Sequence, residues 1–293
     1  MNSEIYNYFY DNVKKRMGDL EILSLEEINS MLEEMYTMSD VDKSVSSEFN
    51  DIIEVSKMGC LVLGLLALFF KNSEKSNKVK GENVVYSSLL TTIANNSLAI
   101  MKLILIGFDY QVGILLRSTY ELFFTLLTIM LDKKKCDLYY DSARLNNSNE
   151  IWRDNFRMKD MNAELEGYEN SITNNSELKF FKKWRKTNYS YYSKFVHNSF
   201  FTCFSHCHTY SNSNEPEDLL KYNLWGGNVT RVQIYLTSLN DLTFWGIKYF
   251  YSILKNSTYI NTKELLLNNG KSILENAMAL SSFYESMFLK IEK

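Results

Sequence analysis

The sequence predicts an all-α protein, a multi-helix bundle with long central helices. Two observations favour this fold class. The chain of 293 residues contains one proline and 11 glycines, so residues that interrupt helices are scarce. Between short polar segments run long stretches rich in Leu, Ile, Lys, Glu, Asn and Ser, which together indicate a mostly helical chain. A chain of this length can bury a sizeable core as one large or two modest domains.

The order of apolar and polar stretches predicts a string of helices. Ser24 begins a capping-box pattern with the glutamate three residues later, which opens the first helix. The polar segments Lys71–Gly81 and Ser211–Glu217 predict loops. Asp109 begins a very apolar helix, and Lys133–Lys135 ends that helix with the positive charge that its dipole favours. The expected helices cover residues 24–38, 46–70, 82–106, 109–131, 136–145, 150–161, 176–186, 189–208, 229–254 and 262–291.

The Lys71–Gly81 loop is also the expected boundary within the chain. We expect residues 1–80 to form an N-terminal helical region. Residues 81–293 are then the main helical bundle, which carries a pocket built from arginine, glutamate and histidine side chains.

Charge and cysteine content restrict the function classes. The formal net charge is −3, so any contact with nucleic acid would have to come from a local basic patch. The four cysteines, Cys60, Cys136, Cys203 and Cys207, are scattered along the chain, which indicates a reducing compartment rather than a disulfide framework. We therefore expect a cytoplasmic protein.

The sequence also leads us to expect no integral membrane segment. Met1–Leu20 mixes acidic and basic residues and lacks the apolar core of a signal peptide. Gly59–Phe70 is uncharged but has only the length of a buried core helix. The apolar stretch Leu103–Leu131 would have to carry three charged side chains through lipid, at a cost of several kcal/mol. Peripheral membrane contact by the aromatic stretch Phe244–Tyr251 stays open.

Arg117 and Glu121 form the leading candidate site. Their four-residue spacing puts both side chains on one face of a helix, one turn apart. The surrounding stretch is apolar, and charged groups are rarely buried unless they are paired. Two interpretations follow. The pair is a structural ion pair, or it is an arginine that binds phosphate or carboxylate and is held in place by the glutamate.

Tyr189, Ser193 and His197 form a second candidate cluster. They follow one another at four-residue steps, so they project from one face of the expected helix 189–208. A catalytic serine–histidine pair needs an orienting acid, which Glu121 could supply only through the fold. Apolar neighbours of His197 make a core histidine the alternative interpretation.

All three histidines and two of the cysteines fall between residues 197 and 208, a pattern that raises the question of a zinc site. One helix cannot turn His197, Cys203, His206, Cys207 and His208 toward a single point, and tetrahedral sites draw ligands from more than one segment. We therefore expect no metal and no cofactor. A metal-dependent hydrolase built on the three histidines remains an alternative.

A stripe of lysines on one expected helix indicates a possible binding surface for an anionic partner. Four lysines share one face of the expected helix 176–186, and aromatic residues occupy the other face. The lysines are Lys179, Lys182, Lys183 and Lys186. Such a face suits binding to a phosphate backbone, so RNA or a nucleotide is a candidate partner. The alternative is a solvated face over an aromatic core. A protein partner or a homo-oligomer is also open.

Two segments carry a resemblance. GILLRSTYE at residues 113–121 and YSKFVH at residues 192–197 resemble a bacterial helical family of unknown function, over roughly residues 84–255. Its pattern is an apolar helix ending Leu-x-Arg-x-x-x-Glu, then a later Tyr/Ser-x-x-x-His helix. That family is similar in style to the higher eukaryote and prokaryote nucleotide-binding (HEPN) bundles, many of which are RNases or toxin components in phage defence. Those nucleases carry arginine and histidine at short spacing on one helix. Here the pair would be Arg117 with His197, brought together between helices.

These observations predict a defence- or toxin-like helical protein that acts on or senses a phosphate-bearing ligand, with ribonuclease as one form of that activity. Arg117, Glu121 and His197 would be the catalytic residues. His197 would transfer protons, and Arg117 would stabilise the charge of the phosphorane. Tyr189 and Ser193 would help to bind the ligand. The alternative is a non-enzymatic interaction or scaffold protein whose ion pair is structural.

Overall fold

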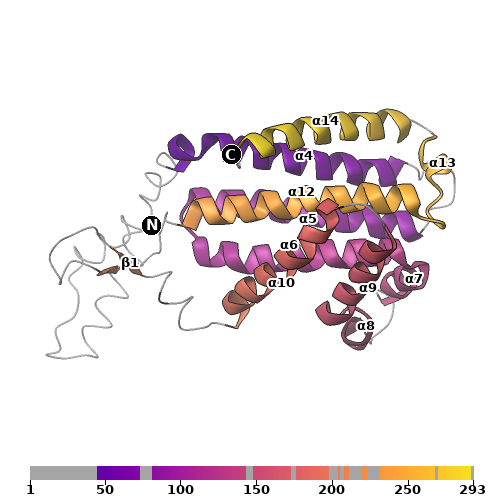
Figure 1. Cartoon of the computed structure of the whole chain (residues 1–293), viewed down its shortest axis with the longest axis horizontal. Coiled ribbons are helices and arrows are strands. Elements are labelled where there is room, and N and C mark those ends of the chain that lie inside the picture. The colour runs from indigo at the N-terminus through magenta and orange to yellow at the C-terminus, as the bar shows by residue number, and fades with distance from the viewer. Residues whose placement is uncertain are drawn as a thin grey trace, which may run out of the picture.

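The predicted all-α fold is confirmed: the chain folds into a bundle of packed helices (Figure 1). The computed structural model describes residues 45–72, 81–142, 148–172, 176–197, 204, 208–210, 220–222, 231–267 and 270–291. Its helices are α4 (Asn50–Asn72), α5 (Gly81–Leu105), α6 (Asp109–Leu131), α7 (Lys133–Ser142), α8 (Ser148–Asn155), α9 (Met158–Ser171), α10 (Ser176–Val196), α12 (Val232–Asn256), α13 (Thr262–Leu265) and α14 (Gly270–Ile291).

Five long helices run along the length of the bundle. Figure 1 shows α4 beside α14, with α12, α5 and α6 below them, while α10 crosses α6 obliquely. Helices α7, α8 and α9 gather at one end, and α9 packs against α6. Helix α4 packs closely on α5 and α14. The division of the chain near residue 80 stays a prediction.

Helix α6 is the centre of the structure, because it packs against α5, α7, α9, α10 and α12. From Phe123 to Met130 every side chain of α6 is buried. An apolar helix that is covered on all sides needs no polar face, which explains why this stretch lacks the usual amphipathic pattern. Its buried residues join two apolar clusters, one around Phe124 and the other around Leu116.

Glycine allows α12 to approach α6 closely. A Cβ atom added at Gly246 would overlap the ring of Phe123 on α6. At Gly59 on α4, an added Cβ would lie 2.9 Å from the side chain of Thr243 on α12. Helix α12 is therefore held close to α6 and α4, at distances that larger residues would not permit.

The expected helices 46–70, 82–106, 109–131 and 229–254 correspond closely to α4, α5, α6 and α12. The segment Lys133–Lys135 was misplaced, because it begins α7 instead of ending α6. The cause is Asp132, whose extended backbone (φ −133°, ψ 110°) ends α6. Its side chain also accepts a hydrogen bond from the backbone N–H of Lys134 at 2.9 Å, as a helix cap does.

Three other helix boundaries differ from expectation. The expected helix 150–161 is divided into α8 and α9, because Arg157 has an extended backbone (φ −64°, ψ 137°). The expected helices 176–186 and 189–208 are one continuous helix up to Val196, α10. The expected helix 262–291 is divided into α13 and α14. The expected helix 24–38 and the expected loop 211–217 lie outside the described residues.

A short antiparallel ladder is the only non-helical element within the described part of the chain. It pairs β1 (His208–Tyr210) with β2 (Leu220–Tyr222), and His208 lies opposite Tyr222. His208 therefore does not share a helix with His197, contrary to the expectation of one helix over residues 189–208.

The expectation of a cytoplasmic protein without an integral membrane segment is wrong. Three helical stretches are long and apolar enough to cross a membrane: Asn50–Lys71 with 22 residues, Gly81–Leu105 with 25 and Asp109–Leu131 with 23. About 20 residues suffice to span the hydrocarbon core. For the first stretch, the expectation counted only the uncharged residues Gly59–Phe70, whereas the apolar helical stretch as a whole begins at Asn50. In the third stretch, Asp109 lies at the helix end and Arg117 pairs inside the bundle.

A glycine pair tests the close packing of α12 on α6. Gly246→Ala should destabilise the fold by about 1–3 kcal/mol, because the new methyl group overlaps Phe123. The matched control is Gly167→Ala on the exposed face of α9, where an added Cβ meets nothing within 4 Å. That variant should gain up to about 1 kcal/mol from helix propensity. Unfolding followed by circular dichroism measures both, and equal stability of the two variants would contradict the packing argument.

Candidate functional site

Arg117 and Glu121 meet on one turn of α6, as the sequence predicts. Nε of Arg117 donates to Oε1 of Glu121 at 2.8 Å, and Nη2 lies 2.6 Å from the same oxygen. The side chain of Arg117 is 10% exposed, whereas that of Glu121 is 34% exposed. The arginine is therefore buried as expected, while the glutamate keeps partial access to the surroundings.

Helix α10 supplies the other partners of Arg117. Nη1 donates to the carbonyl oxygen of Tyr189 at 3.3 Å and to the hydroxyl oxygen of Ser193. Cζ of the guanidinium lies 3.5 Å from the centroid of the Tyr189 ring, close enough for a cation–π interaction. The Ser193 hydroxyl donates in turn to the carbonyl oxygen of Tyr189 at 2.6 Å. We call Arg117, Glu121, Tyr189 and Ser193 the arginine clamp, because they join α6 to α10.

One turn before Arg117, close contact between helices positions the clamp. A Cβ added at Gly113 would overlap the ring of Phe195 on α10. The hydroxyl of Tyr110 donates to the carbonyl oxygen of Phe195 at 3.0 Å. Because α6 and α10 touch at this point, the guanidinium reaches the α10 backbone directly.

His197 lies just beyond the end of α10, and its side chain is exposed. Its backbone N–H donates to the carbonyl oxygen of Ser193 at 3.1 Å. Within the described residues, its imidazole makes no direct hydrogen bond or ion pair with Arg117 or Glu121. The structure thus brings Tyr189 and Ser193 to Arg117 and leaves His197 outside the clamp. Catalytic and ligand-binding roles for these residues stay predictions.

The structure contains a second, more deeply buried ion pair that the sequence did not predict. Arg185 of α10 is 1% exposed and pairs with Glu169 of α9, which is 4% exposed. Nη1 of Arg185 also lies 3.0 Å from the hydroxyl oxygen of Tyr249 on α12, and that hydroxyl donates to Glu169. The hydroxyl of Tyr120 donates to the carbonyl oxygen of Arg185 at 2.6 Å. Burial raises the pKa of Tyr249, so this hydroxyl keeps its proton. The only signal in the sequence was the position of Arg185 beside the aromatic side of its helix.

The basic stripe on α10 is partly neutralised. Nζ of Lys182 lies 3.0 Å from Glu166 on α9, and Nζ of Lys186 lies 3.5 Å from the same carboxylate. Lys183 is exposed. The side chain of Lys179 lies outside the described residues. Two of the four lysines therefore hold α10 to α9, which weakens the case for a face dedicated to phosphate binding.

The histidine and cysteine cluster is only partly described. Cys203, His206 and Cys207 lie outside the described residues. Within the described ranges there is no group of three or more His, Cys, Asp or Glu side chains that could hold a metal ion, and Cys60 and Cys136 are free thiols. The expectation that the cluster is not a zinc site stays a prediction.

No family model matches this chain, and comparisons with curated proteins and with solved structures also give no match. The resemblance to HEPN-like bundles therefore stays a prediction that rests on its two motifs.

The two ion pairs should differ in their contribution to stability. Arg185→Met should cost about 3–5 kcal/mol, because it leaves the Glu169 carboxylate buried without its partner. Arg117→Met should cost less, about 1–3 kcal/mol, since the Glu121 carboxylate is only partly buried. Denaturant unfolding of both variants measures the difference. The double variant Arg185→Met/Glu169→Leu is the control and should recover part of the loss. An equal loss for the two single variants would contradict this ranking.

The contact of Lys182 with Glu166 can be tested by titration. The hydrogen bond from Lys182 holds the pKa of the Glu166 carboxyl below its ordinary value. A depressed pKa stabilises the fold at pH values above the unfolded pKa, and this contribution is lost as the pH falls through the folded pKa. Lys182→Gln should move the Glu166 pKa upward in an NMR titration, whereas Lys183→Gln should not. An unchanged Glu166 pKa in Lys182→Gln would refute the assignment.

Proposed function

We propose that this chain is a non-enzymatic scaffold protein, built as a membrane-associated helical bundle, in which the arginine clamp has a structural role. This is the alternative that the sequence left open for Arg117 and Glu121. The proposal concerns the described bundle and the charged groups inside it.

One observation carries the proposal: each nitrogen of the Arg117 guanidinium contacts an acceptor of the protein itself. Nε and Nη2 contact Glu121, and Nη1 contacts Tyr189 and Ser193. An arginine that stabilises a phosphorane has to direct donors toward the ligand. In the clamp such donors would first have to leave Glu121 or α10, at the cost of breaking charge-assisted hydrogen bonds.

The position of His197 supports the same conclusion. A general acid–base group must come within hydrogen-bond reach of the reacting atoms. His197 is exposed beyond the last turn of α10, and Arg117 is directed into the α6–α10 contact. The positions of the two side chains therefore favour separate roles over a shared catalytic centre.

The membrane setting is supported by α4, α5 and α6. Each contains a stretch of sufficient length and apolar composition to cross a bilayer. Charged residues within membrane helices face the interior of a bundle and pair there. Arg117 follows this rule, because its partners lie on α6 and α10.

Two results are expected for the full chain, one from cell membranes that contain it and one from the purified protein. The protein should stay in the membrane fraction through an alkaline carbonate wash and dissolve only in detergent, since apolar helices hold it in the bilayer. It should not cleave labelled RNA at low salt. His197→Gln should leave stability unchanged within about 0.5 kcal/mol, because the side chain is exposed.

RNA cleavage by wild type and by the variants Arg117→Met and His197→Gln distinguishes a scaffold protein from a nuclease. If wild type cleaves RNA and His197→Gln abolishes the cleavage without loss of stability, His197 is catalytic and the scaffold proposal is refuted. If the carbonate wash releases the wild-type chain, the membrane setting is refuted, and the RNA assay still decides the role of the clamp.

A further inference from the structure

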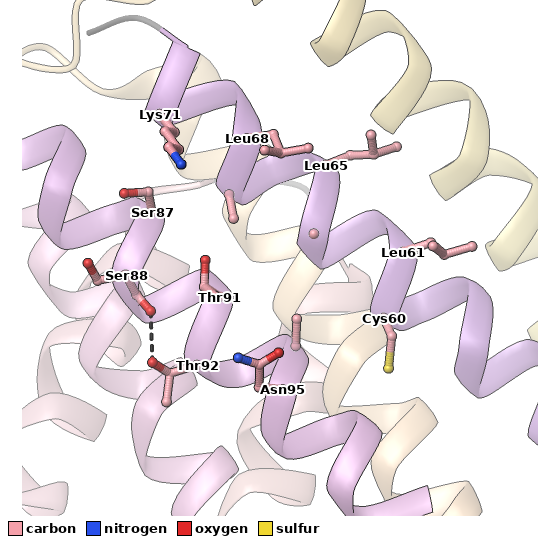
Figure 2. A pocket seen from close by; sticks show the side chains of 13 residues that line it. Cys60, Leu61, Leu65, Leu68, Lys71, Ser87, Ser88, Thr91, Thr92 and Asn95 are labelled. Carbon is pink, nitrogen blue, oxygen red and sulfur yellow. Dashed lines mark hydrogen bonds between the residues drawn. The ribbon is translucent and has the colours of Figure 1, made fainter.

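A groove of about 770 Å³ runs between α4 and α5, on helices that do not contribute to the arginine clamp. Its lining includes Leu61, Leu65 and Leu68 of α4, whose side chains extend in Figure 2 from the side of α4 away from the labelled α5 residues, and the polar side chains of α5. Lys71 and Ser87 lie at one end, and Cys60 and Asn95 lie at the other. The groove is therefore apolar along α4 and has one cationic end.

The α5 wall is compatible with an apolar occupant although it contains hydroxyl groups. The hydroxyl of Ser87 donates to the carbonyl oxygen of Val84 at 3.1 Å, and that of Thr92 donates to Ser88 at 2.8 Å. These two of the four hydroxyl groups on this wall are satisfied by their own helix and need no partner from a ligand. Gly64 leaves the α4 wall open, because an added Cβ there would meet nothing within 4 Å.

The dimensions of the groove match half of a bilayer. Lys71 is the last residue of the candidate span Asn50–Lys71. Cys60 and Lys71 are eleven positions apart, which corresponds to about 16 Å along a helix. That length is roughly half of the 30 Å hydrocarbon core. If α4 spans the membrane, Lys71 lies at the level of the lipid headgroups and the groove follows the acyl chains of one leaflet.

Charge selects the kind of headgroup. Lys71 is exposed, and its ammonium group has no ion-pair partner among the described residues. Basic residues at the end of a membrane helix attract anionic lipids. A zwitterionic headgroup offers a weaker partner, because its own cation accompanies the phosphate.

We propose that the α4–α5 groove binds one anionic phospholipid, with an acyl chain along Leu61, Leu65 and Leu68 and the headgroup phosphate at Lys71. This inference rests on the membrane setting of the proposed function, and it adds a ligand class at a site away from the clamp. Apolar contact supplies most of the affinity, and Lys71 supplies the preference for an anion.

The test titrates the detergent-purified full chain with dioctanoyl phosphatidylglycerol and counts bound lipids by native mass spectrometry. One lipid per chain is expected, with weaker retention of dioctanoyl phosphatidylcholine. Gly64→Leu should abolish binding, because the new side chain fills the groove without a clash at Cβ. Gly167→Leu is the matched control on α9, where an added Cβ also meets open space, and it should bind like wild type.

A charge variant completes the test. Lys71→Gln should weaken phosphatidylglycerol binding about five-fold and leave phosphatidylcholine binding unchanged. Lys102→Gln, on α5 outside the groove, should bind like wild type. Equal binding by Gly64→Leu and wild type would overturn the site, and equal retention of the two lipids would overturn the role of Lys71. Because short-chain lipids bind without a bilayer, failure here is distinguishable from failure of the carbonate test.

Discussion

The structure depends on two buried arginines: Arg117 of α6 pairs with Glu121 and with α10, and Arg185 of α10 pairs with Glu169 of α9. Arg185, Tyr189 and Ser193 follow one another at four-residue steps on α10, so they share one stripe. The carbonyl oxygen of Arg185 accepts the Tyr120 hydroxyl, and Arg117 reaches the next two residues of the stripe. Buried ionic groups are costly unless their hydrogen bonds are satisfied. A shift of α10 by one residue along α6 would break these contacts together, so the two helices have one favourable register.

Contacts between residues of one helix could be predicted from the sequence. The bounds of α6 and the contact of Arg117 with Glu121 follow from local spacing, and both were confirmed. The pair of Arg185 with Glu169 joins residues on different helices, so no periodic pattern could reveal it. The continuity of α10 was also missed. There Asn188 donates to the carbonyl oxygen of Trp184 at 3.2 Å, so a residue that often marks a turn is satisfied within the helix.

The error about membrane segments has a related cause. Charges along the apolar stretch before Leu131 appeared to exclude a passage through lipid. The structure places Asp109 at the beginning of α6, pairs Glu121 with Arg117, and turns Arg117 toward further acceptors on α10. Lipid penalises a charge that it contacts, whereas a charge paired inside a bundle is tolerated. A sequence lists charges along a helix but does not show which face each one occupies relative to the other helices.

A catalytic arginine and a structural one place opposite demands on the same five N–H donors. Catalysis of phosphoryl chemistry requires donors that are preorganised yet still open to the developing charge. A clamp requires those donors to be fully engaged in the resting protein. Arg117 is close to the second demand, since each of its three guanidinium nitrogens contacts an acceptor of the protein and the ring of Tyr189 covers its face. The Glu121 carboxylate, which is 34% exposed, places negative charge beside the guanidinium. Coulomb repulsion between this carboxylate and a phosphate would add to the cost of freeing the guanidinium from its partners, so the electrostatics favour the structural role.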